Sequence, residues 1–197
     1  MSSIVTFVRG YLMELKGLKS NLSQPASRAN VRWSPPTTPE VKVNFDAAFS
    51  AQERKSWSGI VVRDSEGEIL GSACCVNENV DSPFTAEVMA ALQGLRFARD
   101  MGLPEVVVEG DSRSIIQKLV SQTADLSSVR SIISDARQLA SNFRHCRFTF
   151  VGRTGNEAAH AMAIEGRTGL VDCFWVEDGP PSVLAVAASD RRFGEPP

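Results

Sequence analysis

Three acidic residues of this 197-residue chain occur where carboxylates could do chemistry. Asp46 interrupts the alternating apolar segment VKVNFDAAF, in which an unpaired carboxylate carries a large desolvation cost unless a cation or partner compensates it. Glu87 lies one turn into a predicted helix, and Asp111 follows an apolar, β-branched run. Carboxylates that converge from such positions could hold one or two hard divalent cations, which prefer oxygen ligands. In the structural alternative, Asp111 caps a helix, Glu87 complements a helix dipole and Asp46 lies on an exposed sheet face.

The elements that must position these carboxylates follow from the periodicity of the sequence. A two-residue period predicts strands over 41–49, 57–64 and 68–76. Ser82 and Pro83 are typical of a helix start, and they predict a helix over about 83–101. Later patterns predict a strand over 104–110, helices over 111–120 and 126–142, a strand over 146–152 and a helix over 156–167. The order βββαβααβα indicates the α/β class, a mixed sheet with helices on its faces.

The two ends of the chain differ from this body. Apolar residues between positions 4 and 19 recur at three- and four-residue steps, which predicts an amphipathic helix. Residues 20–40 contain four prolines and read as an extended linker. We therefore expect a helix and Pro-rich linker over 1–39, a domain over 40–167 and a peripheral C-terminal tail over 168–197. The N-terminal helix could pack on its own domain or bind a protein partner.

Five ordered motifs of the body resemble a known family. VNFDAAF, GIVVRDSEGEILG, TAEVMAALQGL, VVVEGDS and RTGNEAAHAMA, preceded by WSPPTTPEVKVNFD, are similar to the plant ribonuclease H-like domain of the reverse-transcriptase-like type, a relative of non-LTR retroelement ribonuclease H. The resemblance covers about residues 33–165. It implies a ribonuclease H-like fold with a five-stranded mixed sheet, in the order 3-2-1-4-5, flanked by helices.

The same resemblance implies a catalytic site. The family's first aspartate, its glutamate and its second aspartate fall on Asp46, Glu87 and Asp111, whereas His160 stands where typical ribonucleases H place a fourth carboxylate. The implied activity is endonucleolytic hydrolysis of the RNA strand of RNA–DNA hybrids, with two Mg²⁺ or Mn²⁺ ions held by these four residues. Neutral imidazole contributes no charge, so the second ion should bind weakly. Alternatively, His160 only packs, and the chain is a weak or inactive nucleic-acid-binding or interaction module.

Residues beside these positions are candidates for nucleic acid contact. Asn44, Ser112, Arg113 and Arg153 could reach phosphates or 2′-hydroxyl groups, by which proteins distinguish RNA from DNA. Asn156 belongs to the same set. The alternative for Arg153 and Asn156 is that they brace the last helix.

Charge and composition bound these hypotheses. The net charge is −2 and the pI about 5.8, so phosphates are not attracted to the chain as a whole. Residues 1–39 carry net +4, and the rest net −6. Bound divalent cations would offset that charge, and we expect weak, salt-dependent binding of nucleic acid. No apolar run approaches the ~18 residues that cross a bilayer. With no secretory leader and no C-x-x-C pair, we expect an intracellular monomer, nuclear or cytosolic, with organelle targeting left open.

Overall fold

A six-stranded mixed sheet forms the centre of the structure, a computed structural model that describes residues 32–121 and 127–192. The helix predicted over 4–19 lies outside the described residues. In chain order the elements are β1 (Val41–Ser50), β2 (Lys55–Arg63), β3 (Ile69–Asn77), α2 (Pro83–Asp100), β4 (Glu105–Gly110), α3 (Arg113–Val120), α4 (Arg130–Ala140), β5 (His145–Phe150), the 3-10 turn η1 (Arg153–Gly155), α5 (Glu157–Gly166), β6 (Cys173–Val176) and α6 (Pro181–Arg192). The predicted order βββαβααβα is confirmed through α5.

Local chemistry accounts for the start of the longest helix. The Ser82 hydroxyl accepts a hydrogen bond from the Thr85 amide at 3.1 Å, and Pro83 occupies the first helical turn. Proline suits that place because its missing N–H would have no intrahelical partner. The predicted start of α2, which carries Glu87, is therefore confirmed.

The strands are arranged in the order β5-β4-β1-β2-β3-β6. β1 pairs antiparallel with β2 and parallel with β4, and β5 adds a second parallel pair beyond β4. The predicted order 3-2-1-4-5 is confirmed, but the predicted count of five strands is wrong. The sixth strand, β6, comes from the segment after residue 167 and pairs antiparallel with β3. Its four residues CFWV are too few to establish a period, so the sequence alone did not predict it.

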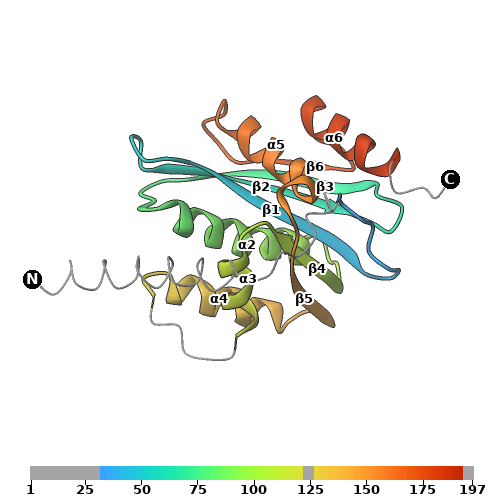
Figure 1. Cartoon of the computed structure of the whole chain (residues 1–197), viewed down its shortest axis with the longest axis horizontal. Coiled ribbons are helices and arrows are strands. Elements are labelled where there is room, and N and C mark those ends of the chain that lie inside the picture. Colours follow the sequence, from blue (N-terminus) through green and yellow to red (C-terminus); the bar gives the residue numbers. More distant parts are fainter. Residues whose placement is uncertain (1–31, 122–126, 193–197) are drawn as a thin grey trace, which may run out of the picture.

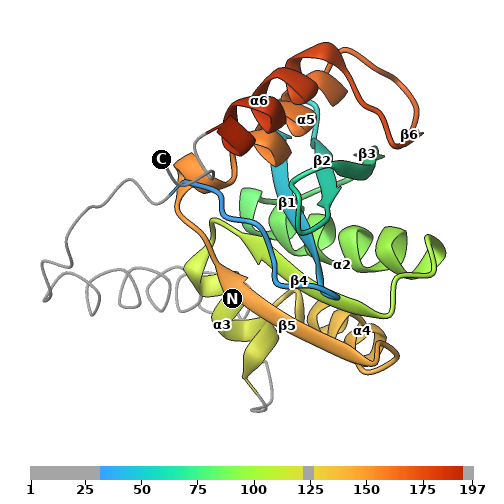
Figure 2. The same cartoon turned by 90° about the vertical axis from the view of Figure 1, so that its right-hand side faces the viewer.

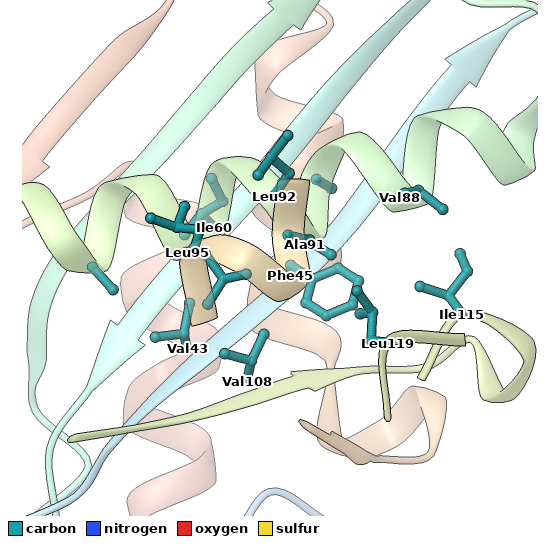
Figure 3. Packing of buried hydrophobic residues seen from close by; sticks show 14 of the residues in the cluster. Val43, Phe45, Ile60, Val88, Ala91, Leu92, Leu95, Val108, Ile115 and Leu119 are labelled. Carbon is teal, nitrogen blue, oxygen red and sulfur yellow. The ribbon is translucent and has the colours of Figure 1, made fainter. Parts of the chain in front are cut away.

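Helices cover both faces of the sheet (Figure 1). α2, α3 and α4 lie on one face, and α5 and α6 lie on the other (Figure 2). Figure 3 shows the larger core, in which Val43 and Phe45 of β1 pack against Leu95 of α2 and Val108 of β4. Because side chains alternate along a strand, Asn44 and Asp46 of β1 are directed to the opposite face, the one that α5 covers.

The segment after residue 167 completes a second hydrophobic core, on the face of the sheet that α5 covers. Val183 and Ala187 of α6 are buried against the face that α5 covers. Asp190 of α6 pairs with the fully buried guanidinium of Arg63, 2.7 Å from nitrogen to oxygen. Trp33 stacks on that guanidinium, 3.7 Å from the ring centroid. The lead-in before β1 and the helix after β6 therefore meet at one buried cation.

Candidate metal centre

Three carboxylates from three elements converge at one end of the sheet. Each of Asp46, Glu87 and Asp111 offers an oxygen, and the three oxygens lie within 4.8 Å of one another. Asp46 is only 1% exposed, which excludes the alternative that it is solvated on an open sheet face. Asp111 follows β4 directly, and Glu87 comes from the first turns of α2. The side chains predicted to converge are thus brought together.

The electrostatics of the cluster favour a bound cation. Burial, together with the charges of Asp46 and Asp111, raises the pKa of Glu87 to about 9. One oxygen of Asp46, Oδ1, and one of Glu87, Oε2, are buried without a hydrogen-bond partner. Buried carboxylate oxygens without partners carry a desolvation cost that a metal ion would remove. The donor set is all oxygen, so it fits Mg²⁺ or Mn²⁺.

His160 and Arg153 cover one side of this cluster. His160 Nδ1 lies 2.7 Å from Asp46 Oδ2. Arg153 donates to Asp111 Oδ2 at 3.0 Å, and its second terminal nitrogen lies 2.9–3.0 Å from the two ring nitrogens of His160. Partial burial lowers the pKa of Arg153, but the hydrogen bond to Asp111 and the charge of Asp46 outweigh it, and the net shift is upward. Arg153 is therefore a permanent cation at the site.

A glycine on β2 permits the close approach of α5 that brings His160 to Asp46. Gly59 lies opposite Asp46 in the β1–β2 register. A Cβ at Gly59 would lie 2.3 Å from the carbonyl oxygen of Ala159, the residue before His160. Only glycine therefore lets α5 lie so close to the sheet at this point.

Asn44 and Asn156 brace the site from inside. Both are fully buried, and Asn44 donates to Asn156 Oδ1 at 3.2 Å and to Glu109 Oε2 at 3.3 Å. Asn156 in turn donates to the backbone carbonyl of Phe45 at 2.8 Å, and its side chain does not cap α5. The prediction that these two asparagines contact nucleic acid therefore needs correction, because their amides are consumed within the protein. Bracing, the alternative for Asn156, agrees with the structure.

Ser112 and Arg113 lie at the rim of the cluster, next to Asp111. The Ser112 side chain does not cap α3, and its hydroxyl lies 3.2 Å from that of Ser114. Arg113 is exposed, and its guanidinium stacks on Phe150 at 3.8 Å from the ring centroid. Both remain available to a ligand at the surface. Arg153, with 59% of its side chain exposed, is available too, although it is already paired with Asp111.

The sequence did not reveal the buried polar network beneath the carboxylates. Glu109 of β4, paired with Lys42 of β1 at 3.0 Å, lies opposite Asn44 in the parallel register. Asn44 Oδ1 also accepts from Trp33 Nε1 at 3.0 Å and from Arg63 at 3.1 Å. Charged residues in the otherwise apolar segments VKVNF and PEVVVEG were the available signal. Their pairing depends on the β1–β4 register, which the sequence does not display.

This chain is similar to a known protein family over the segment that carries the site. The model of the family described as "Reverse transcriptase-like" matches residues 44–166, which include all four predicted catalytic positions. The "Putative ribonuclease H protein" of Arabidopsis thaliana is 26% identical over 164 residues, 81% of this chain. The match covers 26% of that relative, so this chain spans about a quarter of its length.

Solved structures show the same fold. RNase H1 from the halophilic archaeon Halobacterium salinarum NRC-1 aligns with a TM-score of 0.61 and 25% identity, over 66% of this chain and 98% of that one. The N-terminal RNase H domain of a Mycobacterium tuberculosis protein aligns with a TM-score of 0.59 and 20% identity, over 76% and 97%. LC11-RNase H1, in complex with RNA/DNA hybrid, aligns with a TM-score of 0.56 and 17% identity, over 64% and 94%. The fold is ribonuclease H-like.

Among the helices of the described residues, none combines the length and the apolar character that crossing a bilayer requires.

Proposed function

Because this chain belongs to the reverse transcriptase-like family, we propose that it hydrolyses the RNA strand of RNA–DNA hybrids with the help of divalent cations. One observation carries the proposal: Asp46, Glu87 and Asp111 converge within 4.8 Å and include two buried oxygens without partners. A merely structural carboxylate cluster of this kind would be costly, because like charges repel and each burial has a desolvation penalty.

Asp46, Glu87 and Asp111 would hold Mg²⁺ or Mn²⁺ in this proposal. A divalent cation bound there supplies Lewis acidity, which activates water and offsets the charge of the scissile phosphate. Glu87 must give up its proton when the cation binds, because its raised pKa leaves it protonated at neutral pH in the cation-free protein. His160 completes the site from α5 by holding Asp46 Oδ2.

Residues at the rim would position the substrate. Arg113 presents a guanidinium held by its stack on Phe150, and Ser112 presents a hydroxyl beside Asp111. A guanidinium can contact a phosphate, and a hydroxyl can contact a 2′-hydroxyl group. LC11-RNase H1 was solved in complex with RNA/DNA hybrid, and its shared fold supports the choice of substrate class.

The test is cleavage of a labelled RNA–DNA hybrid with Mg²⁺ or Mn²⁺. Wild type is expected to cut the RNA strand, and Asp46→Asn is expected to lose at least a hundredfold in rate. Asp135→Asn is the matched control, because Asp135 is exposed on α4, which covers the face of the sheet opposite to the one that Asp46 faces. Absence of cleavage by wild type with either ion, at saturating hybrid, would refute the proposal.

A second candidate function is a weak or inactive module that binds nucleic acid through the same fold. The observation that favours it is the cover of Arg153 and His160 over Asp46 and Asp111, which occupies oxygens that a cation could use. Hybrid binding by wild type without cleavage, unchanged in Asp46→Asn, would favour this candidate over the enzyme.

A further inference from the structure

The two sides of the carboxylate cluster differ in how their oxygens are occupied. On one side, Asp46 Oδ2 lies 2.7 Å from His160 Nδ1 and 4.0 Å from a terminal nitrogen of Arg153, and Asp111 Oδ2 accepts from the same nitrogen at 3.0 Å. On the other side, Asp46 Oδ1 and Glu87 Oε2 are buried and have no partner. One carboxylate oxygen of Asp46 therefore has polar partners, and the other has none.

His160 and Arg153 contact each other and the carboxylate cluster at the same time. His160 Nδ1 lies 2.7 Å from Asp46 Oδ2, and one terminal nitrogen of Arg153 lies 2.9 Å from Nδ1 and 3.0 Å from Nε2 of the same ring. The ring therefore holds the guanidinium in place, and the other terminal nitrogen of Arg153 donates to Asp111 Oδ2 at 3.0 Å.

Charge matching explains why the guanidinium occupies this position. One terminal nitrogen of Arg153 lies 3.0 Å from Asp111 Oδ2 and 4.0 Å from Asp46 Oδ2, and Arg153 is the cation closest to the cluster among the contacts of the described residues. A metal ion entering on the same side would have to displace the guanidinium from Asp111 and His160 from Asp46. It would otherwise lie beside a fixed positive charge, and such like-charge contact is strongly unfavourable near a buried site.

We propose that Arg153, held in place by His160, fills the position of a second divalent cation, so that the chain binds one divalent cation at this centre. This inference rests on the proposed function, since it concerns the same cation site. The remaining cation belongs on the unsatisfied side, where Asp46 Oδ1 and Glu87 Oε2 provide ligands. His160 is a positioning residue here, because it affects the number of bound cations only by holding Arg153 in place.

The experiment counts Mn²⁺ ions in the full chain by isothermal titration and by electron paramagnetic resonance. Wild type is expected to bind one equivalent, with the resolved hyperfine spectrum of an isolated ion. Arg153→Gln is expected to bind a second equivalent, with an affinity for that second ion at least tenfold higher than that of wild type. Its spectrum should show the broadening of two coupled ions. Arg144→Gln, which loses an exposed guanidinium beside Glu105, is the matched control and should behave as wild type does.

Each result has a defined meaning. Two equivalents of similar affinity in wild type, or a single equivalent in Arg153→Gln, would overturn the inference. A wild type that binds one Mn²⁺ and cleaves no hybrid would overturn the proposed function while the count of one still supports the inference. Absence of Mn²⁺ binding to wild type and to Arg153→Gln alike would overturn both. Because Arg153 is mostly exposed, its substitution should leave the melting transition in place, which the same samples will show.

Discussion

Replacing Glu87 by glutamine should stabilise the cation-free protein, although it removes a proposed ligand. The folded protein raises the pKa of Glu87 from 4.5 to about 9, chiefly by burial and then by the charges of Asp46 and Asp111. Between those two values the folded state keeps a proton that the unfolded state loses. The contribution of Glu87 to stability is therefore greatest below pH 4.5, falls as the pH rises, and is fully lost above about pH 9.

The size of the effect follows from the same shift. Between pH 4.5 and about 9, each pH unit lowers the free energy of unfolding by at most ~1.4 kcal/mol. At pH 7 the carboxyl group of Glu87 therefore lowers the free energy of unfolding by up to roughly 3 kcal/mol. Glu87 keeps some contact with solvent, and screening reduces the figure to the order of 2 kcal/mol. Glutamine carries no titrating group, and its amide can donate to the neighbouring carboxylates. The advantage of Glu87→Gln should grow from near zero at pH 5 to a few kcal/mol at pH 8.

Urea unfolding in the presence of a chelator, at pH 5, 6, 7 and 8, measures this difference directly. Glu53→Gln is the control, because Glu53 is exposed in the turn after β1, and its stability should follow wild type at every pH. Added Mn²⁺ should reverse the order, since an ion that binds only folded wild type stabilises it by mass action. A difference between Glu87→Gln and wild type that does not change with pH would refute the reasoning.

Two further substitutions test the packing that supports the site. Asp190→Asn should lower the free energy of unfolding by about 3–5 kcal/mol, because it leaves the buried Arg63 guanidinium without its carboxylate; a loss below about 1 kcal/mol in urea unfolding would contradict that account. Gly59→Ala should cost about 1–3 kcal/mol and also weaken Mn²⁺ binding, because the added methyl group pushes α5 away from β2. Unchanged urea and Mn²⁺ titrations of Gly59→Ala would show that α5 approaches less closely than the structure indicates.

The sequence predicted those parts of the fold whose signal is local. Alternation along β1 and the Ser82–Pro83 start of α2 each specify an element within a few residues, and both are confirmed. The four residues of β6 pair with β3, more than ninety residues away in the chain, as the register of Gly71 with Val176 illustrates. No local pattern could reveal them, because a four-residue strand owes its stability to the neighbour with which it pairs.

The candidate site also has a part that the sequence predicted and a part that it did not. The motifs and the resemblance indicated Asp46, Glu87 and Asp111, and the structure brings them together. The partners of a side chain were harder to predict: Asn44 shares the face of β1 with Asp46, yet its amide donates to Glu109 and Asn156 in a buried network. Proximity along the chain to a site therefore predicts contact with a ligand only when no buried partner already binds the side chain.

That network gives the N-terminal lead-in a role in the domain and moves the expected boundary. Trp33, before the predicted start at residue 40, is 4% exposed, donates to Asn44 and stacks on Arg63. Asn44 is two residues from Asp46 on the same face of β1. Substitution of Trp33 should therefore disturb the strand that carries the central carboxylate. The stable domain should therefore begin before Trp33, and the α6 residue Asp190, which pairs with the same Arg63, belongs to it as well. Elements outside the predicted domain of 40–167 thus hold β1 in the position that the carboxylate cluster requires.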